Sequence, residues 1–521
     1  MPSKVFSAAV VGLDAQVIEV ETDVSYGLRF FNIVGLADQA VSESKERVEA
    51  AIKSIKFSPP HRQPIRVLVN LAPADLKKEG SLYDLPIALG FLLASKQTKF
   101  DPSNKIFLGE LALDGKLRPI KGVLSISLMA KEKGFKEIIL PKVNAFEAAL
   151  VKDLKVVGLE SLKEVVEYLE GRKKADSFEM NIEDFLENPN YQSDIGWIKG
   201  QEYAKRALEI SASGSHNLIM EGPPGAGKTL LAKAIPTILP KLSFEESIEV
   251  TKIYSISGLL SENRPLVNLR PFRSPHHTSS EVALIGGGNP PRPGEITLAH
   301  RGVLFLDEFP EFHRDVLESL RQPIEDGNIT ISRAKNFLTF PARFTLVAAT
   351  NPCPCGYFND PEKKCTCMSS QISMYRRKLS GPLMDRMDLF INVPALKYEK
   401  LAAEGDEFSS DKVRFRVESA RQLQKERFTR QNFAKQNLGG FKEEKILTNS
   451  EMNIPQIKKY CKIDLKSQDL LRKYVNSGKL SARGYHRVLK VARTIADLGD
   501  SANILFEHLA EALMYRTKEE K

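Results

Sequence analysis

Long hydrophobic runs are missing from this sequence of 521 residues. No apolar stretch approaches the roughly 20 residues that a membrane-spanning helix needs. The apolar segment 5–13 near the N-terminus is short, contains Ser7 and leads directly to Asp14, so it does not fit a secretory signal. These two absences argue against a membrane protein and predict a cytoplasmic one with no membrane partner.

Cysteine is scarce as well. The sequence has five, and four of them crowd between Cys353 and Cys367. Cysteines placed so close together cannot form disulfides that connect distant parts of a long chain, so a secreted fold held by disulfides is excluded. A reducing compartment agrees with the expected cytoplasmic location.

Charge of one sign is only mildly in excess. The chain has 75 Lys and Arg against 66 Asp and Glu, a formal net charge of +9. Spread evenly, this excess would mean little, whereas concentrated on one surface it would attract the phosphates of a nucleic acid. Composition therefore permits a nucleic-acid partner without demonstrating one.

The most informative stretch that is present runs from Gly222 to Thr229 and matches the phosphate-binding pattern G-x-x-x-x-G-K-[ST]. A buried strand is predicted before it and a helix after it, which favours this motif over a plain Gly/Pro-rich turn. Glycines let backbone N–H groups close around phosphate oxygens, and the helix presents its positive end to them. Lys228 would reach the β- and γ-phosphates and the Thr229 hydroxyl would bind Mg²⁺. The predicted nucleotide-binding residues are Gly222, Pro223, Pro224, Gly225, Ala226, Gly227, Lys228 and Thr229.

A second buried run, 301–306, ends in the carboxylates Asp307 and Glu308. At the end of a strand beside the phosphate loop, Asp307 would stand next to Mg²⁺ and Glu308 would orient and polarise the attacking water. A third run, 344–350, ends in Asn351. Because ligands of open parallel sheets bind at the carboxyl ends of the strands, these side chains predict one site for ATP and Mg²⁺ and for ATP hydrolysis.

Residues 1–172 alternate strand and helix patterns and predict an α+β domain. The segments 109–122, 130–134 and 138–142 resemble the proteolytic domain of the Lon family. Lon-type proteases use a Ser and a Lys, the Lys acting as base for the hydroxyl nucleophile.

Neither residue of that dyad is present at its position in this domain. Counted without gaps from Gly80, the serine position holds Leu82 and the lysine position holds Leu124. The resemblance therefore implies a degenerate domain retained as a scaffold. A displaced dyad of Ser81 and Lys121 is the alternative.

The triphosphate site resembles that of AAA+ ATPases, with Asn351 at the sensor 1 position, where it would hold the γ-phosphate or the attacking water. The segment 379–389 resembles the arginine-finger segment of MCM helicases and magnesium chelatase subunits, which implies that role for Arg386. The segment 480–487 resembles their sensor 2 and implies that Arg483 reaches the γ-phosphate at the start of a lid helix. A finger supplied by a neighbouring subunit implies a ring, expected to be a homo-hexamer.

Two insertions resemble features of the same branch. The Gly/Pro-rich stretch 268–300 is similar to its helix-2 insertion, and 328–340 is similar to its pre-sensor 1 hairpin, with Arg333 and Lys335 near the tip. Basic tips suit a DNA backbone in a pore, although a solvated turn explains them equally well. The helix expected at 411–436 is the most basic long stretch, either as a solvated face or as a second nucleic-acid contact.

The cysteine cluster has the form C-x-C, nine residues, C-x-C, and consists of Cys353, Cys355, Cys365 and Cys367. Four thiolates could enclose a tetrahedral Zn²⁺. The gaps of one residue are tighter than the usual spacing, so the sequence leaves zinc and reduced free thiols open as alternatives.

The expected fold class is α/β: a P-loop AAA+ core with an α-helical lid, preceded by an α+β Lon-protease-like domain. The expected segments are 1–172 (Lon-like domain), 173–190 (linker), 191–394 (AAA+ core) and 395–521 (lid of the magnesium chelatase C-terminal type).

The whole combination resembles the YifB/ComM family of magnesium-chelatase-like ATPases. That resemblance implies a hexameric ATP-driven motor on single-stranded or branched DNA, a branch-migration helicase of recombination or natural transformation. A magnesium chelatase-type motor subunit and an AAA+ protein remodeller or Lon-like protease are the alternatives.

Overall fold

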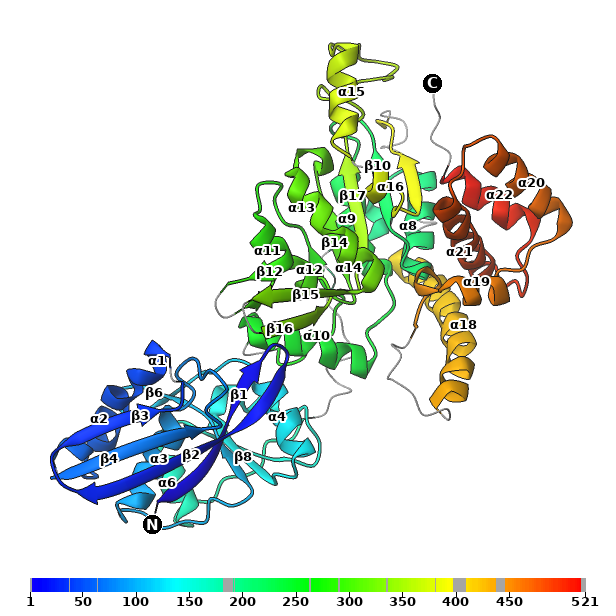
Figure 1. Ribbon diagram of the computed structural model, residues 1–521. Coiled ribbons are helices and arrows are strands. Elements are labelled where there is room, and N and C mark those ends of the chain that lie inside the picture. Colours follow the sequence, from blue (N-terminus) through cyan, green and yellow to red (C-terminus); the bar gives the residue numbers. More distant parts are fainter. Residues whose placement is uncertain are drawn as a thin grey trace. The chain divides into compact units, whose positions relative to one another are not determined.

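The computed structural model describes residues 2–516 except 37, 63, 181–190, 192, 262–263, 289–290, 334–335, 380, 397–408 and 437–445. The chain forms two compact units (Figure 1). One unit comprises Met1–Asn188 and Ser243–Asn268, and the other comprises Pro189–Leu242 and Leu269–Lys521. Within the described ranges, no helix is long and apolar enough to cross a membrane.

The first unit is built on a mixed seven-stranded sheet of order β3-β4-β2-β1-β5-β8-β9. Strands β1 and β2 form an antiparallel hairpin, β4 pairs antiparallel with β2, and the remaining pairings are parallel. Along β4 the side chains of Ile65, Val67, Val69 and Leu71 are buried in alternation with more exposed neighbours, as the two-residue period of a strand requires. The strands are β1 (Ser3–Val11), β2 (Asp14–Tyr26), β3 (Phe30–Val34), β4 (Ile65–Ala72), β5 (Lys105–Phe107), β8 (Glu137–Pro141) and β9 (Lys155–Leu159), with a separate small hairpin of β6 (Glu110–Leu111) and β7 (Leu117–Arg118).

Helices pack on this sheet, and α3 is buried along nearly its whole length. The mixture of helices with a partly antiparallel sheet confirms the predicted α+β class of the N-terminal domain. The helices are α1 (Gln39–Ser42), α2 (Ser44–Ser54), α3 (Asp84–Ala94), α4 (Val123–Glu132), α5 (Ala145–Ala148), α6 (Leu162–Leu169) and α10 (Phe244–Ser257), with 3-10 turns η1 (Pro60–Arg62) and η2 (Lys142–Asn144).

Helix α10 lies far along the sequence yet belongs to this first unit. A capping box of Ser243 and Glu246 begins it, and it packs against α4. Lys252 forms an ion pair of 2.9 Å with Asp14, and Leu266 enters the hydrophobic core of the unit. The segment predicted as one core domain, 191–394, therefore contains a stretch that packs with the N-terminal unit.

The two leucines at the Lon-type dyad positions belong to or pack against the hydrophobic core of the first unit. Leu124 is fully buried, and Leu82 packs against the core. The Ser81 hydroxyl donates to the Glu110 carboxylate, whereas the Lys121 side chain lies against Gly258. The two residues of the alternative dyad thus have different partners.

The second unit is built on a five-stranded parallel sheet of order β11-β14-β17-β10-β18. Its central strands are buried on both faces, which is why they read as unbroken apolar runs rather than alternating ones. This sheet, with helices around it, confirms the predicted α/β class of the core. The strands are β10 (Leu218–Glu221), β11 (Phe272–Arg273), β14 (Val303–Leu306), β17 (Thr345–Thr350) and β18 (Leu389–Asn392).

Two small hairpins lie outside this sheet. The predicted hairpin at 328–340 is present as β15 (Asn328–Arg333) and β16 (Asn336–Pro341), and Arg333 ends the first strand, whereas Lys335 lies outside the described residues. The other is β12 (Gly286–Gly287) with β13 (Arg292–Pro293), inside the stretch predicted as the helix-2 insertion. The helices of the core are α8 (Glu202–Gly214), α9 (Lys228–Ile238), α11 (Glu281–Ile285), α12 (Glu295–Leu298), α13 (Arg314–Ser319), α14 (Arg321–Asp326), α15 (Ser369–Arg377) and α16 (Gly381–Met384), with 3-10 turns η3 (Ile195–Trp197) and η4 (Phe309–Glu311).

The C-terminal part is helical, as predicted. Its long helix α18 and its last long helix α21 both pack against α8 of the core, so the lid and the sheet share one hydrophobic core (Figure 1). The lid consists of α18 (Ser410–Gln436), α19 (Ile454–Tyr460), α20 (Leu465–Asn476), α21 (Ala482–Leu498) and α22 (Phe506–Met514), with the 3-10 turn η5 (Asn449–Glu451).

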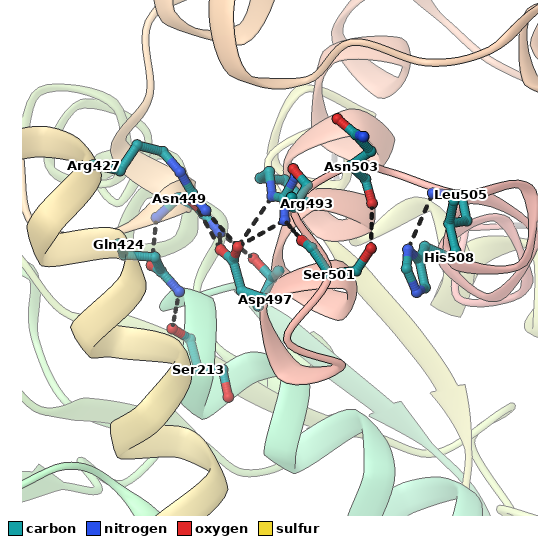
Figure 2. A network of polar contacts seen from close by, with 12 residues as sticks. Ser213, Gln424, Arg427, Asn449, Arg493, Asp497, Ser501, Asn503, Leu505 and His508 are labelled. Atoms are coloured by element: carbon teal, nitrogen blue, oxygen red, sulfur yellow. Dashed lines mark hydrogen bonds and ion pairs between the residues drawn. The ribbon is translucent and has the colours of Figure 1, made fainter.

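A buried polar network joins the lid helices to one another and to α8 (Figure 2). The fully buried carboxylate of Asp497 accepts from Arg427 at 2.9 Å and forms an ion pair with Arg493 at 2.9 Å. Asn449 also donates to Asp497, at 2.8 Å, and its backbone N–H donates to Gln424. Gln424 in turn donates to a backbone carbonyl at the end of α8.

Replacing Asp497 by Ala is expected to lower the free energy of unfolding of the lid-bearing unit by about 3–5 kcal/mol, because it leaves the buried Arg493 and Arg427 without their carboxylate. Urea unfolding of the full chain measures this loss. The control is Asp469→Ala on α20, whose exposed carboxylate lies 3.5 Å from Arg472 and whose loss should cost no more than about 0.5 kcal/mol. Equal losses in the two variants would contradict a special role for the network.

Candidate nucleotide site

The loop 222–227 connects the end of β10 to the start of α9, which is the strand–loop–helix arrangement predicted from the sequence. A Cβ at Gly222 would stand 2.1 Å from the carbonyl oxygen of Val393, so only glycine fits beside the end of β18. Gly225 and Gly227 have φ values of +79° and +87°, a backbone conformation that favours glycine. The loop therefore has the backbone that brings N–H groups toward a phosphate.

Lys228 links the loop to the end of the neighbouring strand β17. Its ammonium donates to the carbonyl oxygens of Gly222 and Pro223 at 2.6 and 2.9 Å, and to Oδ1 of Asn351 at 3.1 Å. Burial lowers the pKa of Lys228 below its ordinary value, while the carboxylates of Asp307 and Glu221 oppose this effect. The cation is thus held at the loop, beside the amide predicted as sensor 1.

The pair predicted to bind Mg²⁺ is also in contact. Oγ1 of Thr229 donates to Oδ2 of Asp307 at 2.8 Å, although 78 positions separate them in the sequence. Hydroxyl and carboxylate oxygens are the hard ligands that Mg²⁺ prefers, and the ion keeps several water molecules of its own. These two residues therefore fit the ion that the sequence predicts.

Glu308 follows Asp307 in a left-handed backbone conformation, with φ of +51°. A non-glycine residue in that region is uncommon and is often found at functional sites. Its side chain is 57% exposed, and its carboxylate lies 3.0 Å from Nδ1 of His277. The Glu308 carboxylate is therefore open to solvent and held on one side by a histidine.

Sequence reasoning missed His277. It follows β11 in the Gly/Pro-rich stretch, next to His276, and its ring meets the edge of Phe312. The adjacent pair of histidines is the one available signal, because His277 and Glu308 are 31 positions apart and form no local pattern.

Arg386 lies at the amino ends of the parallel strands, whereas the phosphate loop lies at their carboxyl ends. It precedes β18, whose first residue Leu389 is in register with Leu218, the first residue of β10. The Arg386 carbonyl accepts from Asn217, just before β10, whereas the phosphate loop follows the last residue of β10. Four residues of strand span about 13 Å. Arg386 is therefore remote from the nucleotide site of its own chain.

Arg483 lies near Arg386 rather than near the phosphate loop. The Arg386 side chain, only 8% exposed, forms an ion pair of 2.7 Å with Glu325, and Arg483, 59% exposed, lies 3.9 Å from the same carboxylate. Both predicted arginines thus converge on Glu325 of α14.

A buried ion pair holds the segments of these two arginines together. Asp388, two residues after Arg386, lies 2.6 Å from Arg487, one helical turn after Arg483 on α21. Burial alone would raise the pKa of Asp388, but Arg487 and His216 outweigh this and hold it well below its usual range. The start of α21 and the segment before β18 are therefore fixed to each other.

Comparison with known proteins agrees with this architecture. Three family descriptions match the chain: "Magnesium chelatase, subunit ChlI" at residues 194–401, "Subunit ChlI of Mg-chelatase" at 20–144, and "Magnesium chelatase, subunit ChlI C-terminal" at 407–516. The competence protein ComM of Haemophilus influenzae is 42% identical over 98% of this chain and 97% of its own length. The uncharacterised protein YifB of Escherichia coli is 40% identical over 99% of this chain and 97% of its own length.

A more distant relative is the 38 kDa subunit of the magnesium chelatase of Cereibacter sphaeroides, 26% identical over 30% of this chain and 51% of its own length. The similarity to ComM and YifB spans both units and the lid. The chain belongs to the YifB/ComM family of magnesium-chelatase-like AAA+ proteins.

Proposed function

We propose that this protein hydrolyses ATP and uses the energy to move DNA through a homo-hexameric ring, as a branch-migration helicase in recombination or natural transformation. One observation carries the ATPase part of this proposal: five polar side chains meet at the carboxyl ends of the strands of one parallel sheet. They belong to Lys228, Thr229, Asp307, Glu308 and Asn351. The DNA part is supported by the similarity to a competence protein and by the hairpin β15–β16, which ends at the basic residue Arg333.

Each residue of the site has a distinct role in this proposal. Lys228 binds the β- and γ-phosphates in place of the loop carbonyls, and Asn351 positions the γ-phosphate or the water from the neighbouring strand. Thr229 and Asp307 hold Mg²⁺, which supplies neutralisation of the phosphate charge. Glu308 orients the attacking water and accepts its proton.

The position of the two arginines supports a ring. A phosphoryl-transfer site needs a cation to stabilise the negative charge of its transition state. Arg386 and Arg483 lie at the amino ends of the strands, too far from the nucleotide site of their own chain to supply it. A head-to-tail interface would present this end of the sheet to the carboxyl ends of the next subunit's strands, and repetition of such an interface gives a ring when the rotation between subunits closes. Both arginines then act on the neighbour's nucleotide.

Other functions have weaker support. A metal-insertion subunit is suggested by the chelatase relative, which matches only part of the chain. A Lon-like protease would need a nucleophile and a base, and the dyad positions hold the apolar residues Leu82 and Leu124.

The test is the ATPase rate of the purified chain with and without single-stranded and four-way-junction DNA. We expect stimulation by DNA that fades as salt rises, because phosphate contacts release counterions. Replacing Arg333 and Lys335 by Ala should remove the stimulation and keep the basal rate. The charge-matched control replaces Lys116 and Lys163, two exposed lysines of the first unit. If the protein hydrolyses ATP without DNA and neither kind of DNA changes the rate, this result would contradict a DNA motor. It would favour a motor that acts on a protein or inserts a metal ion.

A further inference from the structure

The four clustered thiols lie close enough to share one metal ion. Sγ of Cys353 lies 3.3 Å from Sγ of Cys355 and 3.7 Å from Sγ of Cys365, and the sulfurs of Cys355 and Cys365 are 3.6 Å apart. All four sulfurs, including that of Cys367, lie within 4.8 Å of one another. A tetrahedral zinc centre with Zn–S bonds of about 2.3 Å has sulfurs about 3.8 Å apart. The thiols therefore stand near these positions without a backbone rearrangement.

The surroundings also suit thiolate ligands. The backbone N–H of Cys355 donates to Sγ of Cys367 at 3.3 Å. Such donors stabilise negative charge on sulfur and orient the ligands. An all-sulfur tetrahedral set favours zinc over oxygen-seeking cations such as Mg²⁺ and Ca²⁺.

The cluster is joined directly to the nucleotide site. Cys353 follows Asn351 by two residues, so the first ligand anchors the end of β17. A Cβ at Gly356, inside the cluster, would stand 2.4 Å from Cδ of Pro224 in the phosphate loop. The cluster loop therefore packs tightly against the loop that binds phosphate.

The segment that follows the last cysteine of the cluster also lies close to the end of β17. Cys367 leads into α15, and burial raises the pKa of Tyr375 on that helix, while Thr350 and the backbone of Asn351 lie close enough to act against this effect. The chain thus closes a loop from Asn351 through the four cysteines and back to Asn351.

We propose that Cys353, Cys355, Cys365 and Cys367 bind one structural Zn²⁺, and that this ion holds Asn351 and the phosphate loop in the geometry that nucleotide binding requires. In this proposal the ion takes no part in the reaction and acts only by holding these two segments in position. This inference concerns ATP binding and stands whether or not the ring acts on DNA.

The first experiment measures metal content and nucleotide binding on the purified full chain. We expect one zinc per chain by elemental analysis, lost in Cys355→Ser and kept in Cys461→Ser, a buried cysteine outside the cluster. Co²⁺ in place of zinc should give the intense visible spectrum of tetrahedral thiolate coordination. Removing the metal with a chelator should weaken the binding of a fluorescent ADP analogue about fivefold or more, in the range of coupled sites, and adding zinc should restore it. A chain without metal that also fails to give the cobalt spectrum overturns the site.

A second variant separates the contact from the metal. Gly356→Ala should keep its zinc and bind the ADP analogue more weakly, because the added methyl group meets Pro224. The matched control is Gly478→Ala, which has a similar φ of +71° against +85°, but open space around the new methyl group. Unchanged nucleotide affinity both in Gly356→Ala and in the metal-free protein would overturn the coupling. Neither metal content nor nucleotide affinity depends on stimulation by DNA. A failure of this inference can therefore be distinguished from a failure of the proposed DNA motor.

Discussion

Replacing Glu308 by Gln is expected to lower the rate of ATP hydrolysis by about 10²- to 10⁴-fold while nucleotide binding is kept. The amide has the size and shape of the carboxylate and can still meet His277, but it cannot accept a proton from the attacking water. Lys228, Thr229 and Asp307, the residues proposed to bind the phosphates and Mg²⁺, are untouched by this change. Steady-state hydrolysis and titration with a fluorescent nucleotide separate the two effects.

The matched control for this variant is Glu311→Gln. Glu311 lies in the 3-10 turn that follows Glu308 and forms a surface ion pair with Lys378 at 3.0 Å. Its replacement should leave the hydrolysis rate unchanged within about twofold, since surface pairs contribute little. Turnover at the normal rate in Glu308→Gln would remove Glu308 from the catalytic role.

The parts of the nucleotide site that could be predicted from the sequence are those that follow buried strands. Lys228, Asp307 and Asn351 each stand just after an apolar run or inside a fixed pattern, so local sequence marks them. Parallel pairing of β14, β17 and β10 then brings the three together, since carboxyl ends of parallel strands share one edge. Their roles in catalysis stay predictions until activity is measured.

Contacts between distant segments could not be predicted in this way. The ion pair of His277 with Glu308 depends on how a Gly/Pro-rich stretch folds over the sheet. The convergence of Arg386 and Arg483 on Glu325 likewise requires knowing that α21 docks at the start of β18. No short pattern encodes such an arrangement.

The basic helix α18 shows the same limit. Its arginines suggest a solvated face or a second nucleic-acid contact, but several of them contact other helices of their own unit. Arg416 lies 2.5 Å from Glu209 on α8, and Arg421 donates to the carbonyl of Ala212 at 2.8 Å. A count of charges cannot distinguish residues that dock a helix from residues that are free to meet DNA.

Replacing Arg386 by Ala is expected to lower hydrolysis by about 10³- to 10⁵-fold, the usual contribution of an arginine finger. The loss could also come from misfolding, because the Arg386 side chain is buried and pairs with Glu325. The double variant Arg386→Ala, Glu325→Ala removes both charges and should stay folded but inactive. Arg377→Ala, at an exposed arginine near the end of α15, should keep the wild-type rate.

Mixing two inactive variants tests whether the finger acts between subunits. A Lys228→Ala subunit cannot use its own site but still carries Arg386, so it can supply the finger to a neighbouring Arg386→Ala subunit whose phosphate loop is intact. Mixed rings should therefore regain part of the ATPase rate, with a maximum at intermediate ratios. If Arg386 acted within its own chain, every subunit in the mixture would lack one essential group, and no ratio would restore hydrolysis. Arg386 lies at the amino ends of the parallel strands and the phosphate loop lies at their carboxyl ends. We therefore expect the mixed rings to recover ATPase activity.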